Sequence, residues 1–132
     1  MGRETVLAGN GNDTVFGRLG RDNVSLGQGN DRFVDAQQAG RFGNDTSTGG
    51  AGADTFVFGT LMAADVITDF QIGTDILQLD AALDGSRDAE QFAADFATVV
   101  AGNVAFNFGA GQSITLNGLT STVGLVDDLV LM

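Results

Sequence analysis

The chain has 132 residues, which is enough for one structural domain with a core but not for an additional catalytic domain. It contains 20 glycines and no proline, cysteine, histidine, tryptophan or tyrosine. This composition disfavours an ordinary globular enzyme, because glycine loses more backbone entropy on ordering than any other residue. The 17 acidic and six basic residues give a net charge of −11, which disfavours nucleic acid and anionic membranes as partners and favours cations. Without cysteine, an exported chain needs a staple other than a disulfide, and a bound metal is the usual one.

The sequence indicates neither a secretory signal peptide nor a membrane span. Residues 1–11 contain no apolar run long enough for a signal peptide. Residues 97–126 carry no charge, but asparagine, glutamine, glycine, serine and threonine interrupt them too often for a bilayer span.

A nine-residue repeat organises the first 58 residues. Its signature is an aspartate that lies two residues after a glycine and two residues before an apolar residue. The first triplets are Gly11/Asp13/Val15, Gly20/Asp22/Val24 and Gly29/Asp31/Phe33. After a five-residue insertion at 35–39, the frame resumes with Gly43/Asp45/Ser47 and Gly52/Asp54/Phe56. Only Ser47 departs from the apolar position.

A half-repeat precedes the first full unit. Gly2, Glu4 and Val6 fit the frame, with glutamate in the place of aspartate. Because the exposed end of a solenoid needs a cap, we expect the natural protein to continue upstream of Met1.

The repeats resemble a known family. Residues 49–57, GGAGADTFV, match the nonapeptide G-G-x-G-x-D-x-U-x in full, and residues 26–34 and 8–16 lack only its first glycine. This pattern resembles the calcium-binding repeats of the repeats-in-toxin (RTX, hemolysin-type) family. Residues 65–70, followed by Gly73-Thr74-Asp75, resemble the segment that closes the β-roll in serralysin-like proteases, family I.3 lipases and alginate epimerases.

The resemblance implies a fold and an origin. The expected fold is all-β: a right-handed parallel β-roll, formed by a calcium-binding nonapeptide solenoid, with a C-terminal antiparallel β cap and one short helix. The expected origin is the C-terminal module of a type I secreted bacterial protein.

The repeat also explains how metal would be bound. Six residues of each unit form a turn and three form a short strand, and two units complete one coil, so loops 18 residues apart stack along one edge. Glycines let carbonyl oxygens turn inward and aspartates supply anionic oxygens, and calcium binds six to eight such oxygens. Allowing for the insertion, one edge stacks Glu4, Asp22 and Asp45, and the other stacks Asp13, Asp31 and Asp54. We therefore expect full calcium sites at Asp13/Asp31, Asp31/Asp54 and Asp22/Asp45, and a weaker site at Glu4/Asp22.

The predicted metal ligands are the loop aspartates with the glycines and asparagines of the same turns. They are Asp13, Asp22, Asp31, Asp45, Asp54, Gly11, Gly20, Gly29, Gly43, Gly52, Asn12 and Asn30. Asp65 and Asp69 are added from the family resemblance alone. The alternative is that the aspartates only cap turns, as aspartate often does, but five in-frame triplets favour the metal.

The apolar residues of the repeat predict a thin core between two sheets. Val15, Val24, Phe33 and Phe56 are expected to point into it, and Ser47 is expected to leave a weak layer. Because stacked carboxylates repel each other without metal, we predict that the metal-free chain is disordered and folds on binding calcium.

Residues 59–132 are predicted to form a capping region, which shares one structural domain with the roll of residues 1–58. Apolar alternation predicts a strand over 75–79, and residues 104–108 and 113–116 predict a hairpin around a glycine turn. Asp88 and Gln91 predict the capping box of a helix that ends at Gly102. The apolar face of this helix would comprise Phe92, Phe96, Val99 and Val100.

The C-terminus combines an acid with a following apolar run. This pattern resembles the C-terminal export signal of proteases and lipases secreted by type I transporters, and the predicted signal residues are Asp128, Leu129, Val130, Leu131 and Met132. A final buried strand would have the same pattern, and the two interpretations are compatible.

The absence of histidine and cysteine excludes histidine-based zinc sites, Ser-His-Asp triads and thiol catalysis, and no G-x-S-x-G is present. We therefore predict that the chain is not an enzyme. The favoured function is a calcium-dependent folding and type I secretion module of a larger bacterial exoprotein, which folds outside the cell on binding calcium. Its predicted partners are calcium ions and the type I secretion ABC transporter.

An alternative is binding of anionic polysaccharide, as in the alginate epimerase repeat modules that the sequence resembles. Arg3, Arg18, Arg21 and Arg41 map to the edge of Glu4, Asp22 and Asp45, and arginine suits carboxylate recognition. The competing interpretation is that these arginines balance nearby acids.

Overall fold

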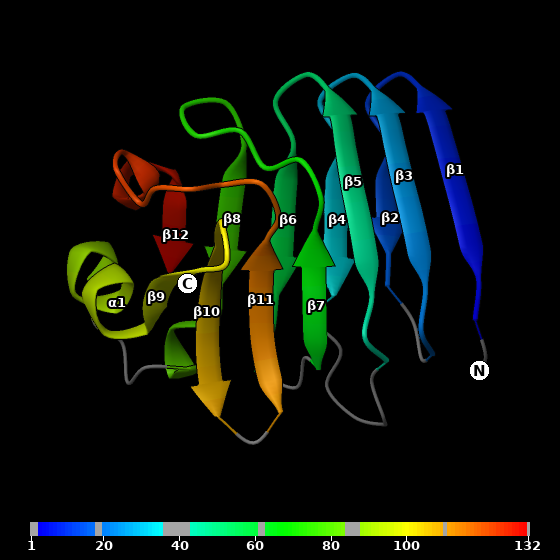
Figure 1. Cartoon of the computed structure of the whole chain (residues 1–132). Coiled ribbons are helices and arrows are strands. Elements are labelled where there is room, and N and C mark those ends of the chain that lie inside the picture. Colours follow the sequence, from blue (N-terminus) through cyan, green and yellow to red (C-terminus); the bar gives the residue numbers. More distant parts are fainter. Residues whose placement is uncertain are drawn as a thin grey trace.

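The computed structural model describes residues 3–17, 20–35, 43–60, 63–83, 88–109 and 111–131. Two β-sheets face each other, and each coil of the chain contributes one strand to each sheet (Figure 1). One sheet has seven strands in the order β1-β3-β5-β7-β11-β10-β9, and the other has five in the order β12-β8-β6-β4-β2. The predicted β-roll with an antiparallel cap is therefore confirmed.

The coils contribute eight parallel strands. The seven-stranded sheet receives β1 (Thr5–Asn10), β3 (Asn23–Gln28), β5 (Thr46–Ala51) and β7 (Ala64–Ile67). The five-stranded sheet receives β2 (Thr14–Phe16), β4 (Arg32–Asp35), β6 (Thr55–Phe58) and β8 (Ile76–Leu79). Each strand pairs in parallel with its counterpart one coil away.

The strand register locates the extra residues of the repeat. Asn23 pairs with Thr5 and with Thr46, so the offset between coils grows from 18 to 23 residues (23 − 5 and 46 − 23). Asp35 is the last residue of β4 and pairs with Phe58, so the expansion lies between Asp35 and Thr46. Residues 36–39 of the predicted insertion lie outside the described residues.

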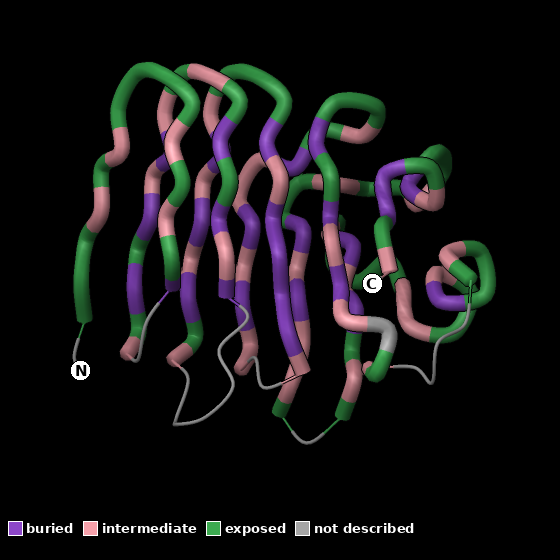
Figure 2. The backbone as a smooth tube through the Cα atoms, turned by 180° about the vertical axis from the view of Figure 1, so that it is seen from behind, coloured by how far each residue is buried: buried purple, intermediate pink, exposed green. Residues whose placement is uncertain are grey.

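Buried residues recur along the strands of both sheets (Figure 2), and their apolar side chains form one core between the sheets. Val24, Phe33 and Phe56 are almost fully buried, as predicted, whereas Val15 in the first coil is only partly buried. Ser47 stands in the row of Val24 and is also buried. Its hydroxyl donates a hydrogen bond of 3.5 Å to the carbonyl oxygen of Val66. The weakness of this layer stays a prediction.

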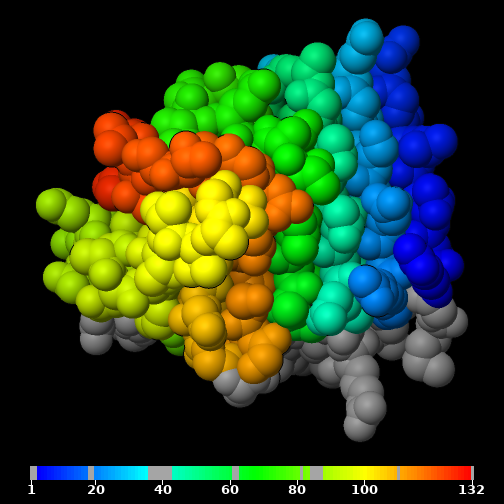
Figure 3. Space-filling view, in the orientation of Figure 1, coloured from blue at the N-terminus to red at the C-terminus, as the bar shows by residue number. Residues whose placement is uncertain are grey.

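The C-terminal half closes the roll with an antiparallel sheet. The predicted hairpin consists of β10 (Asn103–Gly109) and β11 (Gln112–Leu116), and β11 pairs in parallel with β7. A short 3₁₀ helix (Ala81–Leu83) follows β8. A second one (Leu125–Asp128) leads into β12 (Leu129–Leu131), which pairs in parallel with β8. Figure 3 shows these C-terminal segments gathered at the end of the molecule opposite the first coil.

The helix is shorter than predicted. Asp88 caps it by accepting a hydrogen bond from the backbone N–H of Gln91, as expected, but α1 spans only Ala89–Phe96. The prediction that it continues to Gly102 is wrong, because residues 97–100 form β9 (Ala97–Val100), which pairs antiparallel with β10. The run Thr98-Val99-Val100 is β-branched and favours a strand. Val99 and Val100 are consequently 51% and 57% exposed and do not lie on a helix face.

An aromatic cluster joins the helix to the hairpin. Phe92 and Phe96 on α1 pack against Phe106 and Phe108 on β10, with ring centroids 5.1 Å apart for Phe96 and Phe108 and 6.1 Å apart for Phe92 and Phe106. Phe92 and Phe106 are fully buried. Among the described residues, no helix is long and apolar enough to cross a membrane.

Candidate metal centre

Two ladders of aspartates run along the two edges of the roll, where the chain enters each strand. In the first, called the Asp22 ladder, Asp22 and Asp45 directly precede β3 and β5, and Asp65 is the second residue of β7. Each accepts, through Oδ1, a hydrogen bond of 2.8–2.9 Å from the backbone N–H of the residue stacked on it one coil earlier, which is Glu4, Asp22 and Asp45 respectively. A carboxylate of one coil therefore holds the turn of the previous coil.

The second, called the Asp31 ladder, comprises Asp13, Asp31, Asp54 and Asp75, which precede β2, β4, β6 and β8. The Oδ1 atoms of Asp31, Asp54 and Asp75 accept hydrogen bonds of 2.8–3.0 Å from the backbone N–H groups of Asp13, Asp31 and Asp54. The stacking pairs predicted from the repeat, including the pair of Glu4 with Asp22, are those of the structure. Their role as metal ligands stays a prediction.

The second oxygen of four of these seven carboxylates has no hydrogen-bond partner. Oδ2 of Asp13, Asp31, Asp54 and Asp65 is buried without a hydrogen bond, and so are both oxygens of Asp35. A buried charged group without a partner costs several kcal/mol, so such groups in proteins are paired or bind metals. These free oxygens are the feature that a cation would satisfy.

Within the described residues, no buried protein cation balances these carboxylates. Eight aspartates are at most 7% exposed, namely Asp22, Asp31, Asp35, Asp45, Asp54, Asp65, Asp75 and Asp128. The described arginines, Arg3, Arg21 and Arg32, are all exposed. Removing so much negative charge from water requires protons or bound cations.

Burial disfavours the charged forms of these groups. It raises the pKa of Asp45 to about 7, that of Asp65 to about 8 and that of Asp35 to about 6. Repulsion from neighbouring aspartates raises these pKa values further, whereas a hydrogen bond between the carboxyl groups of Asp35 and Asp65 lowers the pKa of Asp35 and raises that of Asp65. Burial is also the main reason why the pKa values of Asp54 and Asp75 are raised.

Glycine allows the turns beside the ladders to stack closely. Gly29 and Gly52 have φ of 132° and 121°, in the region that L side chains rarely adopt. A Cβ atom on Gly52 would collide with the backbone carbonyl of Gly29, and one on Gly29 with that of Gly11. The turns therefore bring backbone carbonyl oxygens and carboxylates of adjacent coils together, and this all-oxygen donor set fits a hard cation such as calcium.

The other predicted ligands occupy two positions. Gly11, Gly20, Gly29, Gly43 and Gly52 lie in the stacked turns, two residues before the ladder aspartates. Asn12 and Asn30 are exposed, and their side-chain oxygens accept hydrogen bonds from the backbone N–H groups of Asn30 and Ala53. The asparagines thus join adjacent coils, as the aspartates do. Their side-chain oxygens already accept backbone hydrogen bonds.

The two residues taken from the family resemblance also differ from each other. Asp65 extends the Asp22 ladder and keeps a free Oδ2 atom. Asp69 accepts hydrogen bonds from the backbone N–H groups of Gly49 and Gly50, one at each oxygen and both at 2.8 Å. Asp69 therefore holds the end of β5 in place.

Two buried aspartates were absent from the predicted ligand set. Asp75 ends the Asp31 ladder, and Gly73, Asp75 and Leu77 repeat the glycine, aspartate and apolar spacing, so the frame itself could have identified it. Asp35 takes a position that Gly17 occupies one coil earlier. No sequence signal marked it as a ligand, because it does not follow the glycine, aspartate and apolar spacing.

Of the remaining predicted site residues, Asp128 lies close enough to the end of the Asp31 ladder for its charge to raise the pKa of Asp75. Asp128 accepts a hydrogen bond of 2.7 Å from the backbone N–H of Gly73, and Leu129, Val130 and Leu131 form β12. Arg3 and Arg21 are exposed on adjacent coils. Arg18, Arg41 and Met132 lie outside the described residues.

Comparison with known families agrees with this architecture. Residues 3–130 match the family described as Peptidase M10 serralysin C terminal. The chain belongs to the serralysin C-terminal family. The resemblance to repeats-in-toxin modules is thereby confirmed for this serralysin C-terminal module.

A solved structure shows the same fold. The crystal structure of the extracellular lipase LipA from Serratia marcescens aligns with the module at a TM-score of 0.53 and 23% sequence identity. The alignment covers 93% of the module and 20% of the lipase chain. The module thus spans about a fifth of the length of that protein. No curated protein sequence matches the module.

Proposed function

We propose that this serralysin C-terminal module is a calcium-dependent folding and export module of a larger secreted bacterial protein. The observation that carries the proposal is the set of buried aspartate oxygens without partners along both ladders. Calcium is the preferred cation, because it accepts six to eight oxygen ligands in flexible geometry, whereas magnesium requires a near-octahedral site and retains water.

Each ion would lie between two stacked turns. The proposed carboxylate pairs are Asp13/Asp31, Asp31/Asp54, Asp54/Asp75, Asp22/Asp45 and Asp45/Asp65, together with the weaker pair Glu4/Asp22. Extracellular calcium modules bind with Kd of about 10⁻⁴ to 10⁻³ M. At tenfold excess of calcium over Kd, each site would stabilise the fold by about 1.4 kcal/mol. Several sites together would decide whether the roll folds.

This dependence suits export through a type I transporter. A chain that stays unfolded in the calcium-poor cytosol can thread a transporter and then fold outside, where calcium is plentiful. The proposed signal residues support this order of events, because Leu129 is only 6% exposed in the folded state and Asp128 is bound to Gly73. A transporter would therefore read these residues before folding, and the activity of the whole protein would lie upstream of this non-catalytic module.

Circular dichroism tests the folding step directly. In a calcium chelator we expect a coil-like spectrum, and in about 10 mM calcium, well above a Kd of this class, a β-sheet spectrum. Magnesium at the same concentration is the matched control and should leave the chain unfolded. A β-sheet spectrum that persists after exhaustive chelation would contradict the proposal.

A second candidate function is binding of anionic polysaccharide. The observation that favours it is the exposure of Arg3 and Arg21 at equivalent positions of adjacent coils, where guanidinium groups could bind sugar carboxylates. Titration with oligoalginate under saturating calcium tests it by calorimetry, with Arg32→Gln as a control for loss of an exposed arginine of the other sheet. Binding that Arg3→Gln and Arg21→Gln do not weaken would contradict this assignment.

A further inference from the structure

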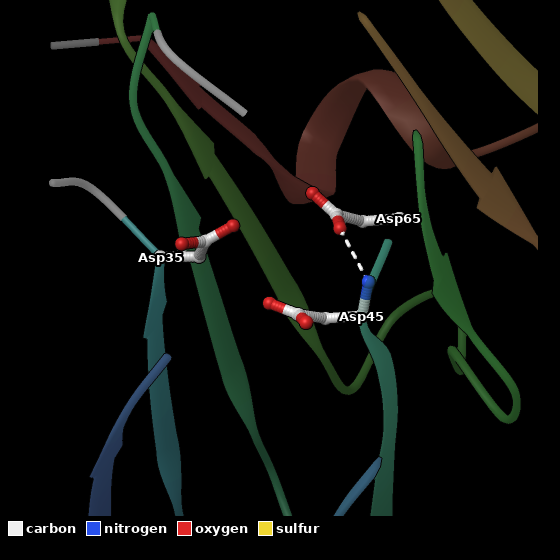
Figure 4. A group of neighbouring side chains, drawn as sticks. All are labelled: Asp35, Asp45 and Asp65. Atoms are coloured by element: carbon white, nitrogen blue, oxygen red, sulfur yellow. Dashed lines mark hydrogen bonds between the residues drawn. The ribbon is translucent and has the colours of Figure 1, made fainter. Parts of the chain in front are cut away.

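Asp35 occupies a place that is a glycine one coil earlier. It ends β4, opposite Phe58, and the backbone N–H of Gly17 donates to the carbonyl of Val34, which puts Gly17 in register with Asp35. Because β4 begins at the Asp31 ladder and ends at the other edge of the roll, the carboxylate of Asp35 reaches the Asp22 ladder. There it lies close to Asp45, which directly precedes β5, and to Asp65 on β7, and the three carboxylates gather around one point (Figure 4).

The three carboxylates are close together and buried. Each is 2% exposed, and one oxygen from each lies within 4.8 Å of the others. The Oδ1 atom of Asp65 accepts the backbone N–H of Asp45 at 2.8 Å, whereas Oδ2 of Asp65 and both oxygens of Asp35 accept no hydrogen bond from a backbone or hydroxyl donor. Without a metal, only a proton shared between the carboxyl groups of Asp35 and Asp65 can join them. An unpartnered carboxylate buried to this extent and directed at two others indicates a bound cation.

Asp69, the equivalent residue at the opposite edge, shows that an aspartate in this position does not always have free oxygens. Asp69 stands two residues after the apolar Ile67, as Asp35 stands two residues after Phe33. Both oxygens of Asp69 accept backbone N–H groups, so its position is explained by hydrogen bonding alone. Asp35 has no such bonds.

We propose that Asp35 is the third carboxylate of a calcium site that it forms with Asp45 and Asp65, and that this is the tightest site of the module. The inference rests on the proposed calcium function and adds to it a ligand that lies outside the repeat. Calcium binds oxygen at about 2.3–2.6 Å, so ligands on opposite sides of one ion lie up to about 5 Å apart. A separation of no more than 4.8 Å therefore permits all three carboxylates to bind one calcium ion.

Two substitutions test the site. Asp35→Gly introduces the residue found at the equivalent position 17 and leaves only the pair Asp45 and Asp65. Asp35→Asn keeps the shape of the side chain without its charge. Because calcium affinity depends on the number of charged ligands, we expect both variants to lower the affinity of the tightest ion at least about tenfold. The looser sites should be unaffected. Glu90→Gln, which removes one exposed charge on α1, is the control and should titrate as the wild type does.

The measurements are calcium calorimetry and direct laser excitation of bound Eu³⁺, which needs no tryptophan or tyrosine as a sensitiser. The wild type should show one Eu³⁺ excitation band that both Asp35 variants lose or shift, while circular dichroism shows that they still fold on calcium. If Asp35→Gly fails to fold, Asp35→Asn decides the result.

The outcomes separate the two proposals. A wild type that folds on calcium, with Asp35 variants that titrate identically, overturns the Asp35 site and leaves the folding function standing. A wild type that binds one ion through Asp35 but does not fold on it overturns the folding function and leaves the site standing.

Discussion

The two halves of this molecule bury different chemistry. In residues 3–58, the coils are joined by carboxylates whose second oxygens have no protein partner, and the apolar core between the sheets is thin. In the C-terminal half, Phe92, Phe96, Phe106 and Phe108 form a cluster between a helix and an antiparallel hairpin. The comparison teaches that a repeat too short to build a thick core can still form a regular fold if ions between its coils supply the missing stability. The cap obtains its stability from apolar burial.

Removal of calcium is expected to have the largest effect and to separate the halves. Five stacked aspartate pairs at about 1.4 kcal/mol each, for tenfold excess of calcium, would contribute about 7 kcal/mol to the folded state. Hydrogen exchange followed by mass spectrometry should therefore show loss of protection over residues 5–58 on chelation. Residues 103–116 should be the last to lose protection as calcium is withdrawn. Uniform protection with and without calcium would contradict the difference between the halves.

Phe106→Ala probes the cap. Phe106 is fully buried in the aromatic cluster, so truncation should lower the free energy of unfolding by about 3–5 kcal/mol in saturating calcium. Denaturant titration measures this loss. The number of calcium ions per chain, measured by calorimetry, should not change. Val99→Ala, at a position 51% exposed, is the control and should lie within about 0.5 kcal/mol of the wild type.

Asp31→Ala probes the roll. Its Oδ1 atom accepts the N–H of Asp13, and it belongs to two stacked pairs, so we expect a loss of about 3 kcal/mol in calcium. Asp88→Ala removes only a helix cap and should cost about 1 kcal/mol. Equal losses in thermal or denaturant unfolding would contradict the role of the ladders.

The smallest expected effect is the pH dependence without calcium. Burial raises the pKa of Asp45 to about 7 and that of Asp65 to about 8, from 3.8. Between these values and pH 4 the folded chain therefore binds more protons than the unfolded chain, so its stability falls as pH rises through this window. Circular dichroism in calcium-free buffer should show more β structure near pH 5 than near pH 8. With saturating calcium the trend should reverse, because protons compete with the metal for the carboxylates.

The sequence predicted the roll because its signal is local and periodic. The nine-residue spacing placed Asp13 over Asp31 and Asp31 over Asp54, and the same pairs are joined by hydrogen bonds. The end of the helix was predicted less well. Phe92, Phe96 and Val99 have the spacing of a helix face, but residues of these types also suit a strand. Pairing of β9 with β10 decides in favour of the strand, and this contact is not encoded in the local pattern.

By itself, the sequence therefore determined the coil, the stacking of its aspartates and the family, since each follows from spacing along the chain. Only the tertiary structure decided that Asp35 joins Asp45 and Asp65 at one edge. The physical reason is that a carboxylate oxygen is free or bonded according to which groups surround it in space. Its surroundings come from strands ten or more residues away in the chain, which the fold alone brings together.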